Sequence, residues 1–139
     1  MAAAASTKKA SVIITLVTIM LLLLASCSHG DDGPVTVRCN AKTYSEDDSY
    51  SVSKVYMLQM LLTNTPWASD HDIYKSFTHN GVTAYGHATC SRALDTTVCE
   101  ACLNFVMHQA TTICGRSVGA QVVYMDNCTV RYENYAFTD

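Results

Sequence analysis

The sequence predicts an α+β fold in which two helices pack on a roughly five-stranded antiparallel sheet that three disulfides hold. Apolar residues recur at helical spacing in two segments, and apolar and polar residues alternate in about five others. The segments do not follow the regular βαβ order that builds a parallel sheet. Six of the seven cysteines lie beyond residue 38, and an even set in a small secreted domain favours disulfides.

The first residues have the layout of a secretory signal peptide. Lys8 and Lys9 form a positive segment, and residues 11–25 are uncharged and mostly apolar. A signal peptide needs an apolar run of roughly 7–15 residues, whereas a membrane-spanning helix needs about 20. An uncleaved anchor and a lipidated Cys27 are therefore the weaker alternatives.

We divide the chain into a signal peptide at residues 1–27, a loose leader at 28–36 and a single domain at 37–139. We expect secretion without stable membrane insertion. Removal of Lys8 and Lys9 leaves seven Lys and Arg against twelve Asp and Glu, a formal charge of −5. With this charge and no basic stripe, binding to nucleic acid is not expected. No H-E-x-x-H, G-x-S-x-G or paired-carboxylate pattern is visible, so an enzyme is the least favoured hypothesis.

The stretch CSRALDTTVCEAC holds three of the cysteines. Within it, Cys99 and Cys102 have the C-x-x-C spacing of a zinc site or a thioredoxin-like redox centre. A zinc site needs four ligands, and the sequence has no second C-x-x-C or H-x-x-x-H pair. A redox centre of that type follows a buried strand, but the residues before Cys99 are polar. Disulfides are favoured, although six cysteines allow 15 pairings, and the sequence indicates no metal and no cofactor.

The first half of the domain is expected to form a strand, a helix and a hairpin. Residues 35–39 alternate apolar and polar side chains, which predicts a strand. Residues 51–62 predict a helix whose apolar residues are Val55, Met57, Leu58, Leu61 and Leu62. Residues 73–90 form two alternating runs around Asn80 and Gly81. An Asn-Gly pair between such runs is a strong hairpin signal.

The second half is expected to form another helix and two more strands. Asp95 or Thr96 caps a helix that runs to Ile113. Its core face is expected to carry Val98, Cys102, Phe105, Val106 and Gln109. Residues 120–137 hold two strand-like runs around a turn at Asp126 and Asn127. Asn127 begins a formal glycosylation sequon, which we expect to stay unmodified because its middle residue is a cysteine in a tight turn.

These residues together resemble a known family. The C-x8-C-x2-C spacing of Cys90, Cys99 and Cys102, with AYGHATC before it and RYENYAF after it, is similar to the plant ginkbilobin-type antifungal domain. The same domain occurs in cysteine-rich repeat secretory proteins and in the ectodomains of cysteine-rich receptor-like kinases. The resemblance covers about residues 37–137 and implies two helices on a five-stranded antiparallel sheet. The disulfides that it implies, by cysteine order, are Cys39–Cys114, Cys90–Cys99 and Cys102–Cys128.

The resemblance also implies a carbohydrate-binding site. Antifungal members of the family bind mannose through three polar residues, which correspond here to Asn40, Gln121 and Glu133. Gln121 stands where the family has an arginine, and one extra residue precedes Cys128. Arginine offers a permanent charge and a fixed fork of donors, whereas glutamine offers a neutral amide. Arg131, two residues before Glu133 in one strand, is a candidate for the missing charge.

The sequence therefore favours a secreted, non-enzymatic defence protein of the apoplast that binds mannose or mannose-containing glycans of fungal cell walls. The alternative is an extracellular interaction module that binds a receptor ectodomain or a second copy of itself, without sugar. A purely structural interpretation also exists for each residue. Asn40 would then satisfy local backbone groups, and Glu133 would be a solvated strand residue.

Overall fold

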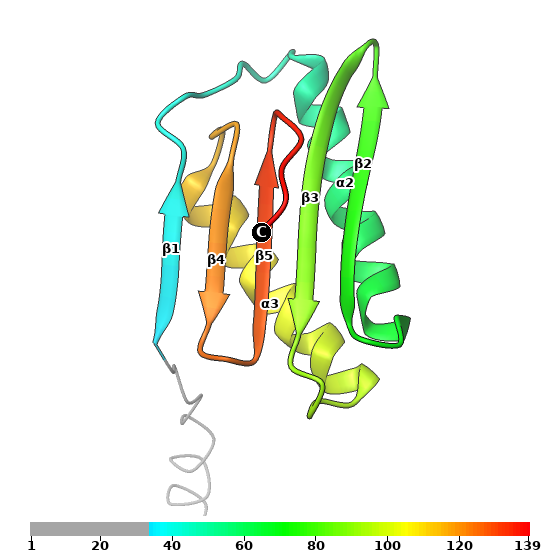
Figure 1. The fold of residues 1–139 in the computed structure, drawn as a ribbon. Helices are drawn as coiled ribbons and strands as arrows, with labels where there is room; N and C mark the ends of the chain where they lie inside the picture. The colour runs from blue at the N-terminus through cyan, green and yellow to red at the C-terminus, as the bar shows by residue number, and fades with distance from the viewer. Residues whose placement is uncertain (1–33) are drawn as a thin grey trace, which may run out of the picture. The chain divides into compact units, whose positions relative to one another are not determined.

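The computed structural model describes residues 34–139, in which five antiparallel strands form one sheet and two helices cover one of its faces (Figure 1). The strands are β1 (Val35–Cys39), β2 (Asp72–His79), β3 (Val82–Cys90), β4 (Ala120–Tyr124) and β5 (Cys128–Glu133), in the order β1-β4-β5-β3-β2. The helical elements are α2 (Ser49–Asn64), the short 3-10 helix η1 (Thr65–Trp67) and α3 (Thr96–Cys114). The predicted fold class is confirmed. The expected signal peptide at residues 1–27 lies outside the described residues.

The sheet begins slightly earlier than the predicted domain boundary. Val35 and Thr36 pair with Tyr124 and Val123 of β4. These two residues therefore belong to the sheet, although they fall within the segment 28–36 that the sequence suggests as a leader.

Aspartates define where the two helices begin. The Asp95 carboxylate accepts a hydrogen bond from the Val98 backbone amide at 2.9 Å, which is the predicted cap of α3. Asp48 accepts in the same way from the Tyr50 amide at 2.9 Å, so α2 starts two residues before the predicted helix. A hairpin joins β2 to β3 through residues with positive φ, at Asn80 (48°) and Gly81 (76°). This backbone is the one that Asn-Gly turns favour.

The predicted core faces of both helices are largely confirmed: Met57, Leu58 and Leu61 of α2 and Cys102 and Val106 of α3 are buried, with one exception on each helix. Val55 and Val98 were expected in the core, yet 60% and 48% of their surfaces are exposed. On α2 the polar Ser53 is buried instead. Its hydroxyl donates to the Val82 carbonyl at 2.7 Å and accepts from the His79 amide at 3.0 Å. A buried polar group with such partners is tolerated, so apolar spacing alone could not identify Ser53 as part of the buried face.

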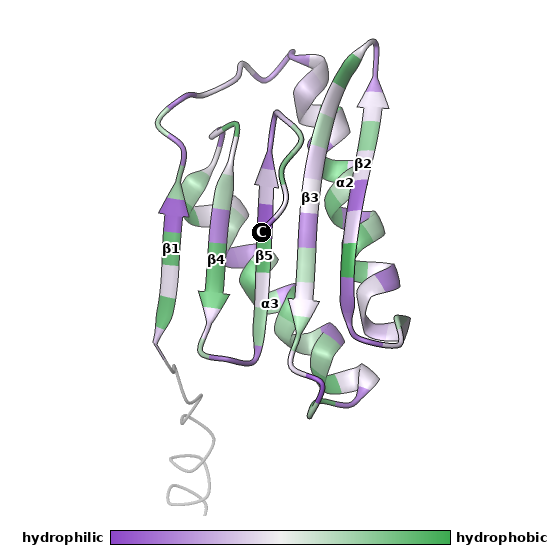
Figure 2. Ribbon diagram, in the orientation of Figure 1, coloured by the Kyte–Doolittle hydropathy of each residue, from purple (hydrophilic) through white to green (hydrophobic). Residues whose placement is uncertain are grey.

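Small residues on β3 let α2 lie close to the sheet. Ala84, Gly86 and Ala88 alternate along the strand and are buried under the helices. A Cβ at Gly86 would overlap the side chains of Met57 and Leu61, which are both fully buried. Hydrophobic and hydrophilic residues alternate along much of each strand (Figure 2). The apolar side chains point toward the helices, so the opposite face of the sheet is mostly polar.

Three disulfides attach α3 to the sheet. The pairs are Cys39–Cys114, Cys90–Cys99 and Cys102–Cys128, with Cα–Cα distances of 5.3, 5.8 and 6.1 Å. They join α3 to β1, β3 and β5, and they are the pairs that the family resemblance implies. Cys99 and Cys102 bond to different partners, so the C-x-x-C spacing is part of a disulfide framework.

Lys54 is a buried cation that has no carboxylate partner within residues 34–139. Only 4% of its surface is exposed, and its ammonium donates to the Gly115 carbonyl at 3.1 Å. The ammonium lies 4.8 Å from the centre of the Tyr44 ring and 5.2 Å from that of Tyr132. Burial lowers the pKa of Lys54 to about 8, and burial raises the pKa of Tyr50 and of Tyr132 above the ordinary value.

We expect the free energy of unfolding to rise with pH between about 8 and 10, because of Lys54. In this interval the folded protein releases the Lys54 proton while the unfolded chain keeps it, so raising the pH favours folding. Above this interval the slope reverses, because Tyr50 and Tyr132 ionise only when unfolded. Lys54→Met should abolish the rise. Denaturant unfolding at several pH values between about 8 and 10 measures how the free energy of unfolding of each protein depends on pH. If the wild type and Lys54→Met show the same dependence, Lys54 is not the cause of the rise.

We also expect the long-range disulfide to hold the edge strand β1. Cys39 and Cys114 are 75 residues apart in sequence, so the double variant Cys39→Ala/Cys114→Ala should lose ~4 kcal/mol of stability. The matched control is Cys90→Ala/Cys99→Ala, which opens a separation of 9 residues and should lose ~2.5 kcal/mol. Amide hydrogen exchange in β1 should accelerate in the first variant. If the exchange rates of the β1 amides do not change, the hydrogen bonds with β4 are sufficient to hold β1 without the disulfide.

Candidate functional site

The three residues that the sequence proposes for a site line one hollow. Asn40, Gln121 and Glu133 lie around a volume of about 340 Å³, together with Arg38 and Arg131. The hollow lies over β1, β4 and β5. Figure 1 shows that the helices cover only one face of these strands, and Arg38, Gln121 and Arg131 project from the other face. Segments distant in sequence thus converge on one polar surface.

Strand register explains this arrangement. Gln121 of β4 lies between Arg38 of β1 and Arg131 of β5, and each pair is directly opposed. Directly opposed residues project from the same face of a sheet, so two arginines flank the glutamine. Sequence reasoning missed Arg38. The two-residue period of a strand puts it on the face of Asn40 and could have identified it.

Glu133 is the most buried charged group of the hollow. The interpretation of Glu133 as a solvated strand residue is wrong, because only 9% of its surface is exposed. One carboxylate oxygen, Oε1, lies 3.5 Å from Nε of Arg131. The other, Oε2, is buried and accepts no hydrogen bond within the described residues. Such an oxygen is costly in a folded protein. Oε2 has almost no accessible surface, so a ligand that brings a donor reaches it only if the Glu133 side chain turns toward the hollow.

Gly119 makes room for this carboxylate. A Cβ at Gly119 would overlap the carboxylate of Glu133. The carbonyl of Gly119 also accepts hydrogen bonds from the backbone N–H of Asn40 at 2.8 Å and from the Ser117 hydroxyl at 2.7 Å. The glycine therefore positions two of the three predicted residues.

Asn40 has one satisfied and one free side-chain group. Its Oδ1 accepts from the Lys42 amide at 3.0 Å, which agrees with a local structural role. Its side-chain nitrogen has no partner among residues 34–139, and the residue is exposed. The amide is thus held in place by its oxygen while its two N–H donors face solvent.

Arg131 supplies the arginine–glutamate pair that Gln121 does not provide. Besides Glu133, its guanidinium pairs with Asp139 and lies 4.2 Å from the centre of the Phe137 ring. The segment that carries Asp139 and Phe137 crosses the open face of β5 and β3 (Figure 1). Asp139 is also 2.7 Å from Nδ1 of His87. Burial alone would raise the pKa of Asp139, but the hydrogen bonds with His87 and Arg131 lower it.

Two further classes of site are not found in the described part of the chain. From residue 34 onward, no helix combines the length and apolar character that crossing a membrane requires. The same residues contain no group of three or more His, Cys, Asp and Glu side chains arranged to hold a metal ion.

The fold and the site place this protein in the class of small disulfide-linked α+β domains, with a polar hollow on the open face of the sheet. Residues 38–135 match the family described as salt stress response/antifungal, and the chain belongs to this family. The resemblance noted from the cysteine spacing is thereby confirmed.

The relatives include an antifungal protein and a plasmodesmata-located protein. Antifungal protein ginkbilobin-2 from Ginkgo biloba is 29% identical over 104 residues, which are 74% of this chain and 77% of that protein. Plasmodesmata-located protein 5 from Arabidopsis thaliana is 28% identical over 118 residues, 81% of this chain but 38% of that protein.

Solved structures of two tandem DUF26 ectodomains share the fold. That of the Arabidopsis thaliana cysteine-rich receptor-like protein PDLP5 has a TM-score of 0.64 and 26% identity, and the match covers 77% of this chain. That of PDLP8, from the same plant, has a TM-score of 0.66 and 22% identity, over 73% of this chain. The chain spans about half of each ectodomain, 52% and 49% respectively.

Gly119→Ala should destabilise the domain by about 1–3 kcal/mol, because the added methyl group overlaps the Glu133 carboxylate in a packed region. The backbone of Gly119 lies outside the left-handed region, so alanine causes no conformational strain there. In the double variant Gly119→Ala/Glu133→Ala the methyl group has space, and most of the loss should be recovered.

Denaturant unfolding of the wild type, the two single variants and the double variant forms a double-mutant cycle. A favourable coupling between the two substitutions is expected. Strictly additive losses would show that the glycine does not make room for the carboxylate.

Proposed function

We propose that this protein is a secreted, non-enzymatic defence protein of the apoplast, which binds mannose-containing glycans of fungal cell walls through the hollow around Glu133. One observation carries the proposal. The Glu133 carboxylate is buried and has one oxygen without a partner, and it faces the same hollow as the free Asn40 amide and the Gln121 side chain.

The chemistry of the hollow suits neighbouring hydroxyl groups. Each hydroxyl of a pyranose donates one hydrogen bond and accepts others. The Glu133 side chain turns toward the hollow and its carboxylate accepts from one hydroxyl, while the Asn40 amide and the Gln121 side chain engage the neighbouring hydroxyls. A hydrogen bond to a carboxylate is about twice as strong as one between neutral groups. Nε of Arg131, 3.5 Å from Glu133 Oε1, helps to hold the carboxylate in place from within the same strand.

The lining favours binding rather than glycoside cleavage. Retaining and inverting glycosidases generally use two carboxylic acids on either side of the bond that breaks. Among the described residues around the hollow, Glu133 is the sole carboxylate. We therefore propose a binding role without catalysis.

The comparisons support an extracellular defence role. One relative is named an antifungal protein, and the solved relatives are ectodomains of receptor-like proteins. A domain with three disulfides also suits an oxidising compartment.

Glu133→Gln should weaken mannose binding about 10- to 100-fold, since a hydrogen bond to a charged group contributes ~1.5–3 kcal/mol. The glutamine keeps the shape of the side chain, so the fold should persist. Gln121→Arg should strengthen binding, because it restores the residue that the family carries. Calorimetric titration of the secreted protein with mannose measures both effects.

The matched control is Glu100→Gln, the same change at an exposed position of α3; it should bind as the wild type does. If the wild type gives no heat and Gln121→Arg does, this chain has lost the sugar activity of the family. If Glu133→Gln binds as tightly as the wild type, the site is wrong.

A second candidate function is an extracellular module that binds a receptor ectodomain. The relatives with solved structures favour it, and the side chain of Trp67 is 78% exposed at the end of α2. A glycan array separates the two candidates. Binding to mannosides that free mannose displaces supports the first, whereas a silent array together with co-purification of a receptor ectodomain supports the second.

A further inference from the structure

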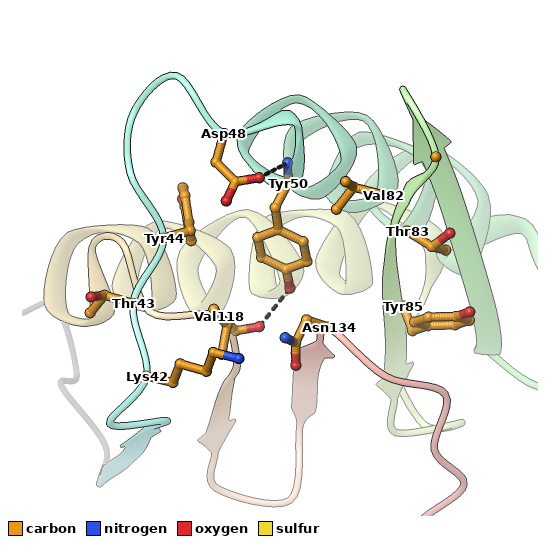
Figure 3. Close-up of a pocket in the computed structure, with 11 residues that line it drawn as sticks. Lys42, Thr43, Tyr44, Asp48, Tyr50, Val82, Thr83, Tyr85, Val118 and Asn134 are labelled. Atoms are coloured by element: carbon orange, nitrogen blue, oxygen red, sulfur yellow. Dashed lines mark hydrogen bonds between the residues drawn. The ribbon is translucent and has the colours of Figure 1, made fainter.

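A second hollow, of about 410 Å³, lies at the end of the sheet where the loop before α2 approaches β3 and β5 (Figure 3). Its walls come from that loop, the start of α2, β3, the start of β4 and the end of β5. The residues that matter for its chemistry are Lys42, Tyr44, Tyr50, Tyr85, Val118 and Asn134.

Hydrogen bonds hold the walls of this second hollow in place. The Tyr50 hydroxyl donates to the Val118 carbonyl at 2.5 Å, and the Val118 amide donates to the Lys42 carbonyl at 2.9 Å. The Tyr44 amide donates to the Arg116 carbonyl at 3.0 Å. The Tyr44 ring also meets the Tyr50 ring edge-on, with centroids 5.2 Å apart. The hollow is therefore formed before any ligand binds.

Three polar groups at this hollow have no partner in the part of the chain that the structure describes. They are the Lys42 ammonium, the Tyr85 hydroxyl and the Asn134 amide, from three separate segments. The ends of the Lys42 and Asn134 side chains point toward each other (Figure 3). Unsatisfied donors and acceptors that converge on a preformed hollow are typical of a ligand site.

The two hollows are neighbours. Asn134 directly follows Glu133, and Lys42 lies two residues after Asn40. Tyr85 of β3 is directly opposite Glu133 of β5, so their side chains project side by side from the open face. Asn134, Lys42 and Tyr85 of the second hollow are thus each close, in sequence or across the sheet, to a residue of the first hollow.

We propose that the second hollow is a subsite for a further sugar unit, so that the ligand is an oligosaccharide rather than a single mannose. This inference rests on the proposed function of the first hollow. Among the described residues, those around the first hollow include no aromatic side chain, whereas three tyrosines line the second. A sugar ring has an apolar C–H surface and an edge of hydroxyl groups. The partly exposed rings of Tyr44 and Tyr85 match the surface, whereas Tyr50 is buried and supports the wall. The Lys42 and Asn134 side chains match the edge.

The test is calorimetric titration of the wild type, Asn134→Ala and Lys42→Ala with mannose, mannobiose and mannotriose. The wild type should bind mannotriose at least about tenfold more tightly than mannose, because the second unit adds hydrogen bonds and ring contacts. Each variant should bind mannotriose about fivefold more weakly and bind mannose as the wild type does. Asn104→Ala, the same truncation at an exposed position of α3, is the matched control and should change neither affinity.

The outcomes separate this inference from the proposed function. If the wild type binds mannose and mannotriose equally, the subsite is overturned and the first site stands. If Asn134→Ala and Lys42→Ala weaken mannose as much as mannotriose, the two hollows are not separate subsites, which also overturns the inference. If the wild type binds none of the three sugars, the proposed function and the subsite both fail.

Discussion

The covalent attachment of α3 to three strands is the constraint on which the rest of this domain depends. The disulfides reach β1, β3 and β5, and β4 is then held between β1 and β5 by its hydrogen bonds. Disulfides act mainly by restricting the unfolded chain, so strands that meet from distant parts of the sequence need less stability from the core. The disulfides also hold the segments that carry the candidate site. Asn40 directly follows Cys39, and Glu133 ends the strand that Cys128 begins.

The site departs from ordinary packing at one point. A buried carboxylate normally has partners for both oxygens, yet among residues 34–139 Glu133 has only Arg131, which lies near one of them. The absence of a side chain at Gly119 is what allows the carboxylate to lie there. Local rules are most often broken at functional sites. A ligand that donates a hydrogen bond to Oε2 would gain binding energy from a group that the fold leaves unsatisfied.

Sequence patterns predicted the elements well because they are local signals. The Asp95 cap and the Asn80–Gly81 hairpin depend on neighbouring residues, and both are present. The disulfide pairing came from the family resemblance, since spacing alone leaves 15 possibilities. Non-local features could not be read from the sequence. The burial of Glu133 depends on Gly119 in another segment, and the burial of Ser53 depends on its partners in the β2–β3 hairpin.

The central claim is that the hollow around Glu133 binds sugar hydroxyls. Nuclear magnetic resonance of isotope-labelled protein during addition of mannose tests it most directly. The account predicts saturable shift changes in the backbone amides of Asn40, Gly119, Gln121 and Glu133 and in the side-chain amides of Asn40 and Gln121, with no change at the far end of β2. Saturable changes confined to other residues, such as those around Trp67, or no changes at all, would contradict it.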